Sequence, residues 1–203
     1  MSFSFCSSSS ELLARLLAEG KNFIGEIAIG SDFSLRHRED MHLDKSQLKL
    51  HESPAAAREI ARYDAKGDYR PLKTAPNLCR GWLLQLLHVQ EMELALEFFY
   101  PAALNLYGAW LEKQLETTAL RETLDRQTGM YRITQKLSDE QAIPLIQKNC
   151  QEGCLRKILW PITLDQEAQP LGVKENEIPL LCREACNLLV ASARKVVKAS
   201  LQV

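Results

Sequence analysis

Four of the six cysteines in the chain fall into two pairs with the same spacing. Cys150 and Cys154 lie in the segment NCQEGC, and Cys182 and Cys186 lie in the segment LCREAC. Residues four positions apart share one face of a helix, about 5 to 6 Å apart at Cβ, so each pair can direct two sulfurs at one point. Two such pairs facing each other would form a cage of four thiolates.

A cage of four thiolates suits either a tetrahedral zinc ion or a 4Fe-4S cluster. Structural zinc sites usually draw each pair from a tight two-residue knuckle, because one ion needs all its sulfurs within about 2.3 Å. The wider C-x3-C spacing favours a cluster, in which each iron takes its own thiolate. Buried, inert thiols that only pack against their neighbours are a third interpretation.

The surroundings of the two pairs favour thiolates. A helix predicted over residues 180–201, after Pro179, would place the second pair in its first turn, where the helix dipole and free amides lower a thiol pKa. Trp160 follows the first pair and would shield a cluster from water. Four basic residues would offset the negative charge of the thiolates: Lys148, Arg156, Lys157 and Arg183.

The remaining two cysteines are isolated in the sequence. Cys79 precedes a predicted strand and is expected to be a small buried residue. Cys6 lies in a serine-rich opening segment that is expected to be disordered. Neither is predicted to be a ligand.

Alternating hydrophobicity predicts the strands ahead of the cysteines. Residues 22–30, 33–38 and 46–51 alternate with period two, and residues 81–88 add another apolar run. Together they indicate a small antiparallel sheet with one solvated face. His37 falls in the second of these segments, where a solvated sheet edge is expected.

Helical signals follow the strands. Ser53 and Pro54 open a predicted helix that stops at Gly67. The apolar period from residue 90 to 115 indicates a helix pair broken at Pro101. Further helices are predicted over residues 116–127 and over residues 139–149, the second with Ser138 and Gln141 as a capping box and Pro144 as an irregularity.

The composition excludes several classes of partner. The chain has 203 residues, with 25 basic and 26 acidic side chains and a net charge of −1. Such a balance gives no field that would attract nucleic acid or an anionic membrane, and no apolar run approaches the roughly 20 residues of a membrane span. The opening MSFSFCSSSSE lacks the features of a secretory signal. We therefore expect a soluble cytoplasmic protein, in which disulfides are not expected.

Two regions of the chain resemble the domains of a known family. NCQEGCLRKILWPI and PLLCREACNLLVASAR resemble the 4Fe-4S cluster-binding domain of a family first known from a multidomain protein with CbiX-type, sirohydrochlorin chelatase-like modules. GEIAIGSDFSLRHRED and TAPNLCRGW resemble the companion stabilising domain of that family. The resemblance implies that Cys150, Cys154, Cys182 and Cys186 bind a 4Fe-4S cluster. No CbiX-like module accompanies these segments, so chelatase activity is not expected of this chain.

The expected fold class is α+β, with a small N-terminal antiparallel sheet and helices followed by a mainly helical cluster-binding part. The expected organisation is a disordered leader over residues 1–20, an α+β stabilising subdomain over 21–135 and a helical cluster-binding subdomain over 136–203.

The predicted function is that of an iron-sulfur protein that moves single electrons or senses redox state, with a redox partner protein. An acidic tetrapyrrole or a chelatase is a further candidate partner. The alternative is a structural or interaction module in which a 4Fe-4S cluster or a zinc ion only holds two helices together. An enzyme is less expected, since the sequence has no phosphate-binding loop, nucleophile elbow or zinc-protease motif.

Overall fold

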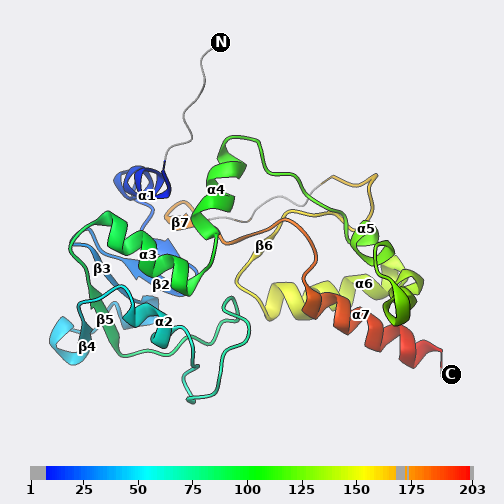
Figure 1. Ribbon diagram of the computed structural model, residues 1–203, viewed down its shortest axis with the longest axis horizontal. Helices are drawn as coiled ribbons and strands as arrows, with labels where there is room; N and C mark the ends of the chain where they lie inside the picture. Colours follow the sequence, from blue (N-terminus) through cyan, green and yellow to red (C-terminus); the bar gives the residue numbers. More distant parts are fainter. Residues whose placement is uncertain (1–7, 168–171, 173, 202–203) are drawn as a thin grey trace, which may run out of the picture. The chain divides into compact units, whose positions relative to one another are not determined.

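The computed structural model describes residues 8–167, 172 and 174–201. The chain divides into two compact units (Figure 1). The first comprises Met1–Lys113 and Val173–Leu180, and the second Gln114–Gly172 and Leu181–Val203. The predicted boundary at residue 135 is therefore too late in the chain, because helix α5 (Leu120–Asp125) packs into the core of the second unit.

The first unit contains a six-stranded mixed sheet in the order β4-β5-β3-β2-β1-β7. Its strands are β1 (Phe23–Ile24), β2 (Ile27–Ile29), β3 (Ser34–His37), β4 (Lys49–His51), β5 (Trp82–Gln85) and β7 (Glu177–Ile178). The α+β class is confirmed. The purely antiparallel sheet is not, because β4 runs parallel to β5 and β7 runs parallel to β1. In both parallel pairs the two strands come from distant segments of the chain, so local alternation does not predict whether they run parallel or antiparallel.

The predicted strand over residues 22–30 is instead a tight hairpin of β1 and β2, with Ile24 opposite Ile27. Gly25 makes the turn with a φ of 54°, a region that side chains other than glycine rarely adopt. A Cβ on Gly25 would also lie 2.6 Å from the ring of Tyr100. The Tyr100 hydroxyl accepts a hydrogen bond of 2.9 Å from the Glu26 amide, which fixes the turn against the end of α3.

A buried charged group lies beneath this hairpin. The Glu26 carboxylate accepts a 3.0 Å hydrogen bond from the Leu78 amide and lies 3.6 Å from the guanidinium of Arg70, which is 1% exposed. Nε2 of His37 lies 3.7 Å from the same carboxylate, and this side chain is 2% exposed. The solvated sheet edge predicted for His37 is therefore wrong, because the carboxylate and guanidinium provide partners inside the unit.

Helix α1 (Ser9–Ala18) replaces most of the predicted disordered leader. A complete capping box joins Ser8 and Glu11, and Leu12, Leu13 and Leu16 are buried. The serine run therefore starts a helix, because its hydroxyl satisfies an amide that has no partner within the helix. Residues 1–7 of the predicted leader, Cys6 among them, lie outside the described residues.

The predicted helix pair is confirmed as α3 (Val89–Phe99) and α4 (Ala103–Leu111). Figure 1 shows α3 lying over the strands, where Phe99 stacks on Trp82 of β5 with ring centroids 5.1 Å apart. Helix α3 also packs against α1 and against α2 (Ala56–Ile60). Helix α2 is shorter than predicted, because the chain after it returns on itself through a bridge between Tyr63 and Tyr69.

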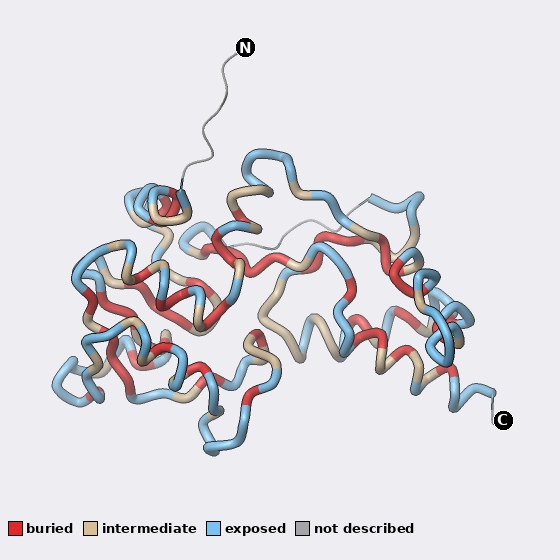
Figure 2. Tube along the Cα trace, viewed as in Figure 1, coloured by how far each residue is buried: buried red, intermediate tan, exposed pale blue. Residues whose placement is uncertain are grey.

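The second unit is mainly helical. It contains α5, η3 (Gly129–Lys136), α6 (Asp139–Ile146), η4 (Gln147–Glu152) and α7 (Asn187–Ser200), with β6 (Lys157–Ile158) paired to β8 (Leu181–Cys182). Buried positions recur along one face of α7 (Figure 2). They join a single core with Trp160 and with residues of α5 and α6, so the helices are held by one shared hydrophobic cluster.

We predict that Gly25→Ala destabilises the first unit by about 3 kcal/mol, because strain at positive φ adds to a collision with the Tyr100 ring. Gly20→Ala is the matched control, since Gly20 has a φ of 82° but an added Cβ would meet nothing within 4 Å. The control should cost only about 1 kcal/mol. Urea unfolding of both variants measures the difference, and equal losses would contradict the assigned role of Tyr100.

Candidate metal centre

The first cysteine pair lies where helix α6 changes its geometry. Ser138 and Gln141 form the predicted capping box at its start. Pro144 lies inside α6, and the chain then widens into the π-helix η4, which carries Cys150. Proline supplies no amide hydrogen, and π-helical turns are common at functional sites. The irregularity predicted at Pro144 is therefore followed by the segment that presents the first thiol.

Asn149 holds the π-helical turn in place. Its Nδ2 donates a 2.8 Å hydrogen bond to the Leu145 carbonyl, and its Oδ1 accepts a 3.1 Å hydrogen bond from Ser192 of α7. The residue next to Cys150 is therefore fixed to two helices. Sequence reasoning missed both residues, since nothing in the local pattern connects Asn149 with a serine on a distant helix.

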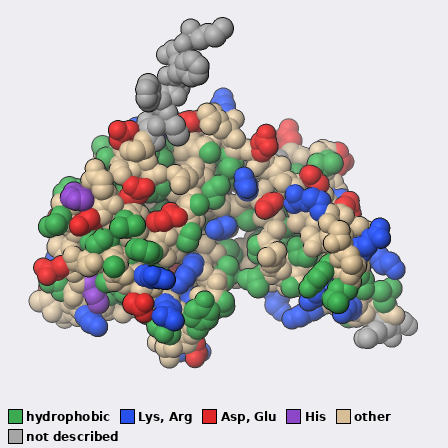
Figure 3. Space-filling model, viewed as in Figure 1, with side chains coloured by type: hydrophobic (Ala, Val, Ile, Leu, Met, Phe, Trp, Pro, Cys, Tyr) green, Lys and Arg blue, Asp and Glu red, His purple; other side chains and the backbone are tan. Residues whose placement is uncertain are grey.

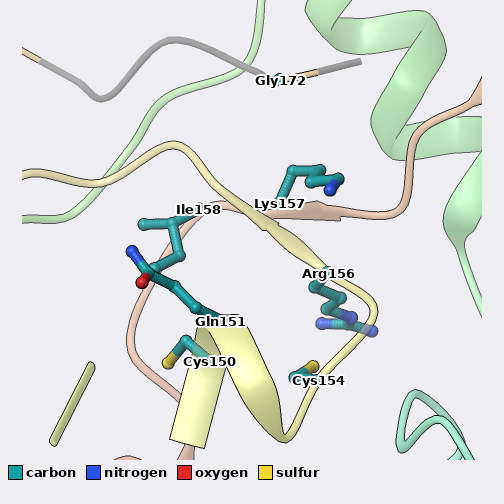
Figure 4. Close-up of a pocket in the computed structure, with 7 residues that line it drawn as sticks. All are labelled: Cys150, Gln151, Cys154, Arg156, Lys157, Ile158 and Gly172. Carbon is teal, nitrogen blue, oxygen red and sulfur yellow. The ribbon is translucent and has the colours of Figure 1, made fainter. Parts of the chain in front are cut away.

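Cys154 follows a turn at Gly153 that brings the backbone close to itself. A Cβ at Gly153 would lie 3.0 Å from the carbonyl oxygen of Lys148 and 3.1 Å from that of Asn149. The chain then continues through Arg156 into β6, as Figure 4 shows. Glycine thus allows the backbone to pass close to the preceding turn, so that Cys154 follows Cys150 by one turn.

The second pair does not lie on one helix. Cys182 is in β8, opposite Ile158 of β6, and its carbonyl accepts a 3.0 Å hydrogen bond from the Leu159 amide. Helix α7 starts only at Asn187, with Cys186 as its N-cap residue. The helix predicted over residues 180–201 is therefore wrong in its first part, because pairing with β6 extends the chain around Cys182. Cys186 does lie at the positive end of a helix, as predicted.

The elements that carry the two cysteine pairs nevertheless pack against one another. Helix η4 packs against both β6 and α7, and β6 pairs with β8, so four elements meet at the cysteines. Burial, and after it negative charge on Cys182, Cys186 and Cys154, raises the pKa of Cys150 to about 12. Cys150 and Cys182 also pack against the core of the unit.

Two groups favour negative charge on Cys182. Burial is the main influence and raises the pKa of its thiol, while a hydrogen bond from Trp160 and the charge of Arg156 oppose this rise. Nε1 of Trp160 donates to the sulfur over 3.4 Å, and the indole is 1% exposed. Trp160 was predicted only as a shield against water, so this N–H···S contact is an addition to its predicted role.

Arg156 and Lys157 line a pocket of about 190 Å³ together with Cys150 and Cys154 (Figure 4). They are two of the four basic residues predicted to offset the charge of the thiolates. The other two, Lys148 and Arg183, are exposed. Positive charge therefore adjoins the sulfurs, as anionic thiolates require.

The other described cysteine lies elsewhere. Cys79 belongs to the first unit, where its thiol is 3.6 Å from the Ile60 carbonyl and burial raises its pKa. Cys79 and the four clustered cysteines are thiols rather than disulfides. In the described part of the chain, no three His, Cys, Asp or Glu side chains are grouped closely enough to hold a single metal ion. None of the described helices is both long and apolar enough to cross a membrane.

The donor set fits a 4Fe-4S cluster. The packed elements supply four thiols, from η4, the turn after it, β8 and the N-terminus of α7, and each iron of such a cluster takes one thiolate. The adjacent N–H donor and basic side chains suit an anionic sulfur environment.

Comparison with family models identifies two domains in this chain. Residues 112–195 match the 4Fe-4S iron-sulfur cluster binding domain, and residues 12–109 match the DR2241 stabilising domain. All four clustered cysteines lie within the first match. The chain therefore carries a domain that binds a 4Fe-4S cluster, which favours the cluster over zinc. None of the curated proteins compared matches the chain.

The solved structure of DR2241 from Deinococcus radiodurans is similar to this chain, with a TM-score of 0.77 and 29% sequence identity. It is described as a multi-domain protein with structural similarity to chelatases and two additional novel domains. The match covers 97% of this chain and 42% of DR2241, so the chain spans less than half the length of that protein.

We predict that Asn149→Ala destabilises the second unit by about 2 kcal/mol, because two hydrogen bonds beside Cys150 are lost. Gln147→Ala is the control, since Gln147 is exposed and its side chain bonds only to Glu152 among the described residues. Amide hydrogen exchange of η4 and α7 provides the measurement. Unchanged protection in the Asn149 variant would contradict this positioning role.

Proposed function

We propose that this chain, which carries the 4Fe-4S cluster binding domain and the DR2241 stabilising domain, uses the cluster to move single electrons or to sense redox state. Its ligands in this proposal are Cys150, Cys154, Cys182 and Cys186. The observation that supports the assignment is geometric: η4 packs against β6 and α7, and β6 pairs with β8, so the elements that carry the two cysteine pairs lie against one another.

Complete ligation by cysteine supports a redox role over a catalytic one. A cluster with a thiolate on every iron supplies one-electron chemistry and leaves no iron open for a substrate. The protein residues then set the potential: Trp160 donates a hydrogen bond to the Cys182 sulfur and Arg156 adds positive charge. Both favour the more negative, reduced state of the site.

The exposure of the ligands supports exchange with a partner. Cys150, Cys154 and Cys182 are half-buried, whereas Cys186 is exposed at the start of α7. Lys157 and Arg183 are exposed close to these cysteines in the sequence. Such a surface suits an acidic redox partner protein that approaches from the side of Cys186.

A chelatase or an acidic tetrapyrrole is a second proposed partner. It is supported by the similarity of DR2241 to chelatases and by the same basic residues. Co-purification with the cluster intact tests both partners, with the Lys157→Glu and Arg183→Glu double variant as control. Reversal of two charges should release an acidic partner, and a partner retained at full yield would contradict docking on this surface.

Substitution of the ligands tests the proposed site. Each of Cys150→Ser, Cys154→Ser, Cys182→Ser and Cys186→Ser should lower the iron and sulfide content of anaerobically reconstituted protein well below four of each per chain. Cys79→Ser is the matched control and should keep the full content, since Cys79 lies in the first unit. A zinc-only centre, or full iron in the Cys182 variant, would reject the assignment.

Potentiometry tests the redox role. Trp160→Phe keeps an aromatic ring in the core but removes the N–H donor to Cys182, so the reduction potential should fall. Trp110→Phe is the control, because Trp110 is 38% exposed in the first unit and should leave the potential unchanged. If the native protein shows no reversible reduction at all, the centre has only a structural role, in which it holds β8 and η4 together.

A further inference from the structure

A second pocket, of about 510 Å³, lies in the first unit on residues that the proposed redox role does not use. Its volume is in the range of pockets that bind small organic ligands, about 300 to 1,000 Å³. Arg58, Arg62 and Lys73 line it, and Tyr69 and Phe98 provide aromatic surface. Figure 3 shows Lys and Arg side chains gathered over the region of α2, beside hydrophobic surface.

Arg58 is the most available of the three basic residues. It lies on α2, its side chain is exposed, and in the described part of the chain that side chain makes no hydrogen bond or ion pair. Arg62 is also exposed and lies 3.7 Å from the Glu59 carboxylate. Ion pairs between two exposed side chains contribute little, so Glu59 does not prevent Arg62 from binding another anion.

Lys73 adds a cation held in a fixed position. Its Nζ donates a 2.6 Å hydrogen bond to the Ala61 carbonyl at the end of α2. Burial lowers the pKa of Lys73, and the positive charges of Arg70 and Arg62 lower it further. Arg70 itself is buried and lies 3.6 Å from the Glu26 carboxylate, so its charge is partly balanced within the unit.

The two acidic residues of the lining, Glu59 and Glu97, do not cancel the positive charge of its three basic residues. Both carboxylate oxygens of Glu97 accept hydrogen bonds of 2.9 Å from the Ala102 amide, at a residue with a φ of 59° before α4. Glu97 thus serves the turn between α3 and α4. Three cations against two carboxylates, one of them engaged by the backbone, give the pocket a net attraction for anions.

The aromatic residues indicate the other part of the ligand. Tyr69 is 66% exposed, and Phe98 is half-buried in the same lining. A flat ring can stack on such faces, while a guanidinium binds phosphate oxygens in a bidentate manner. A ligand that uses both features carries an aromatic ring and a phosphate group.

We propose that this pocket binds a nucleoside phosphate, with Arg58 and Lys73 on the phosphates and Tyr69 on the base. The site is independent of the cysteines, so its test and that of the redox role fail or succeed separately.

Calorimetric titration of the cluster-loaded full chain with ADP tests the proposal, with adenosine and pyrophosphate as partial probes. ADP should bind saturably at one site and more tightly than either probe. Arg58→Ala and Lys73→Gln should each weaken ADP binding about tenfold, as expected for the loss of one charged hydrogen bond. Tyr69→Ala should weaken the binding of ADP but not of pyrophosphate.

Lys66→Ala is the matched control, because it removes an exposed positive charge from the same segment but outside the lining. It should bind ADP like the native chain, and circular dichroism should show that every variant is folded. The absence of saturable ADP binding would overturn the proposal. Equal losses in the Arg58 and Lys66 variants would do so too, since only net charge would then matter, as would pyrophosphate binding as tight as that of ADP.

Discussion

The second unit depends on the packing of two separated segments, each of which carries one pair of cysteines. The first segment supplies Cys150 from a π-helix and Cys154 from the turn after it, and the second supplies Cys182 from a strand and Cys186 from a helix N-terminus. Pairing of β6 with β8 aligns the two segments. The hydrophobic core then holds α7 against the rest of the second unit. Cys150 and Cys182 pack against the same core, so the positions of these thiols depend on it.

The backbone around the cysteines could not be predicted from their spacing. The same four-residue interval occurs in both pairs, yet Cys150 lies in a π-helix and Cys182 in a strand. The helix that should have carried the second pair begins only at Asn187, because Cys182 pairs with a strand formed from residues 157 and 158. Propensity describes local preference, and a partner this far away in the sequence overrides it.

In the first unit, apolar patterning predicted β3, β4, β5 and the helix pair, because each depends on residues close in sequence. The hairpin at Gly25, the strand β7 and the parallel direction of β4 were missed. So was the buried group of Glu26, Arg70 and His37, whose members come from three segments. A charged residue in a sequence looks the same whether it faces water or a buried partner, and only tertiary contacts distinguish the two.

Because of strand β7, the chain cannot be cut at one position into two coding fragments that each contain a complete unit. The chain completes β6 in the second unit, gives Glu177 and Ile178 to the sheet of the first, and returns to the second for Cys182. A gene fragment that starts at Gln114 would encode a strand without its sheet, with an unpaired edge open to aggregation. A fragment that ends at Lys113 would leave β1 without this neighbour. Recombination that divided the two coding regions would therefore damage both products, so they should be inherited together.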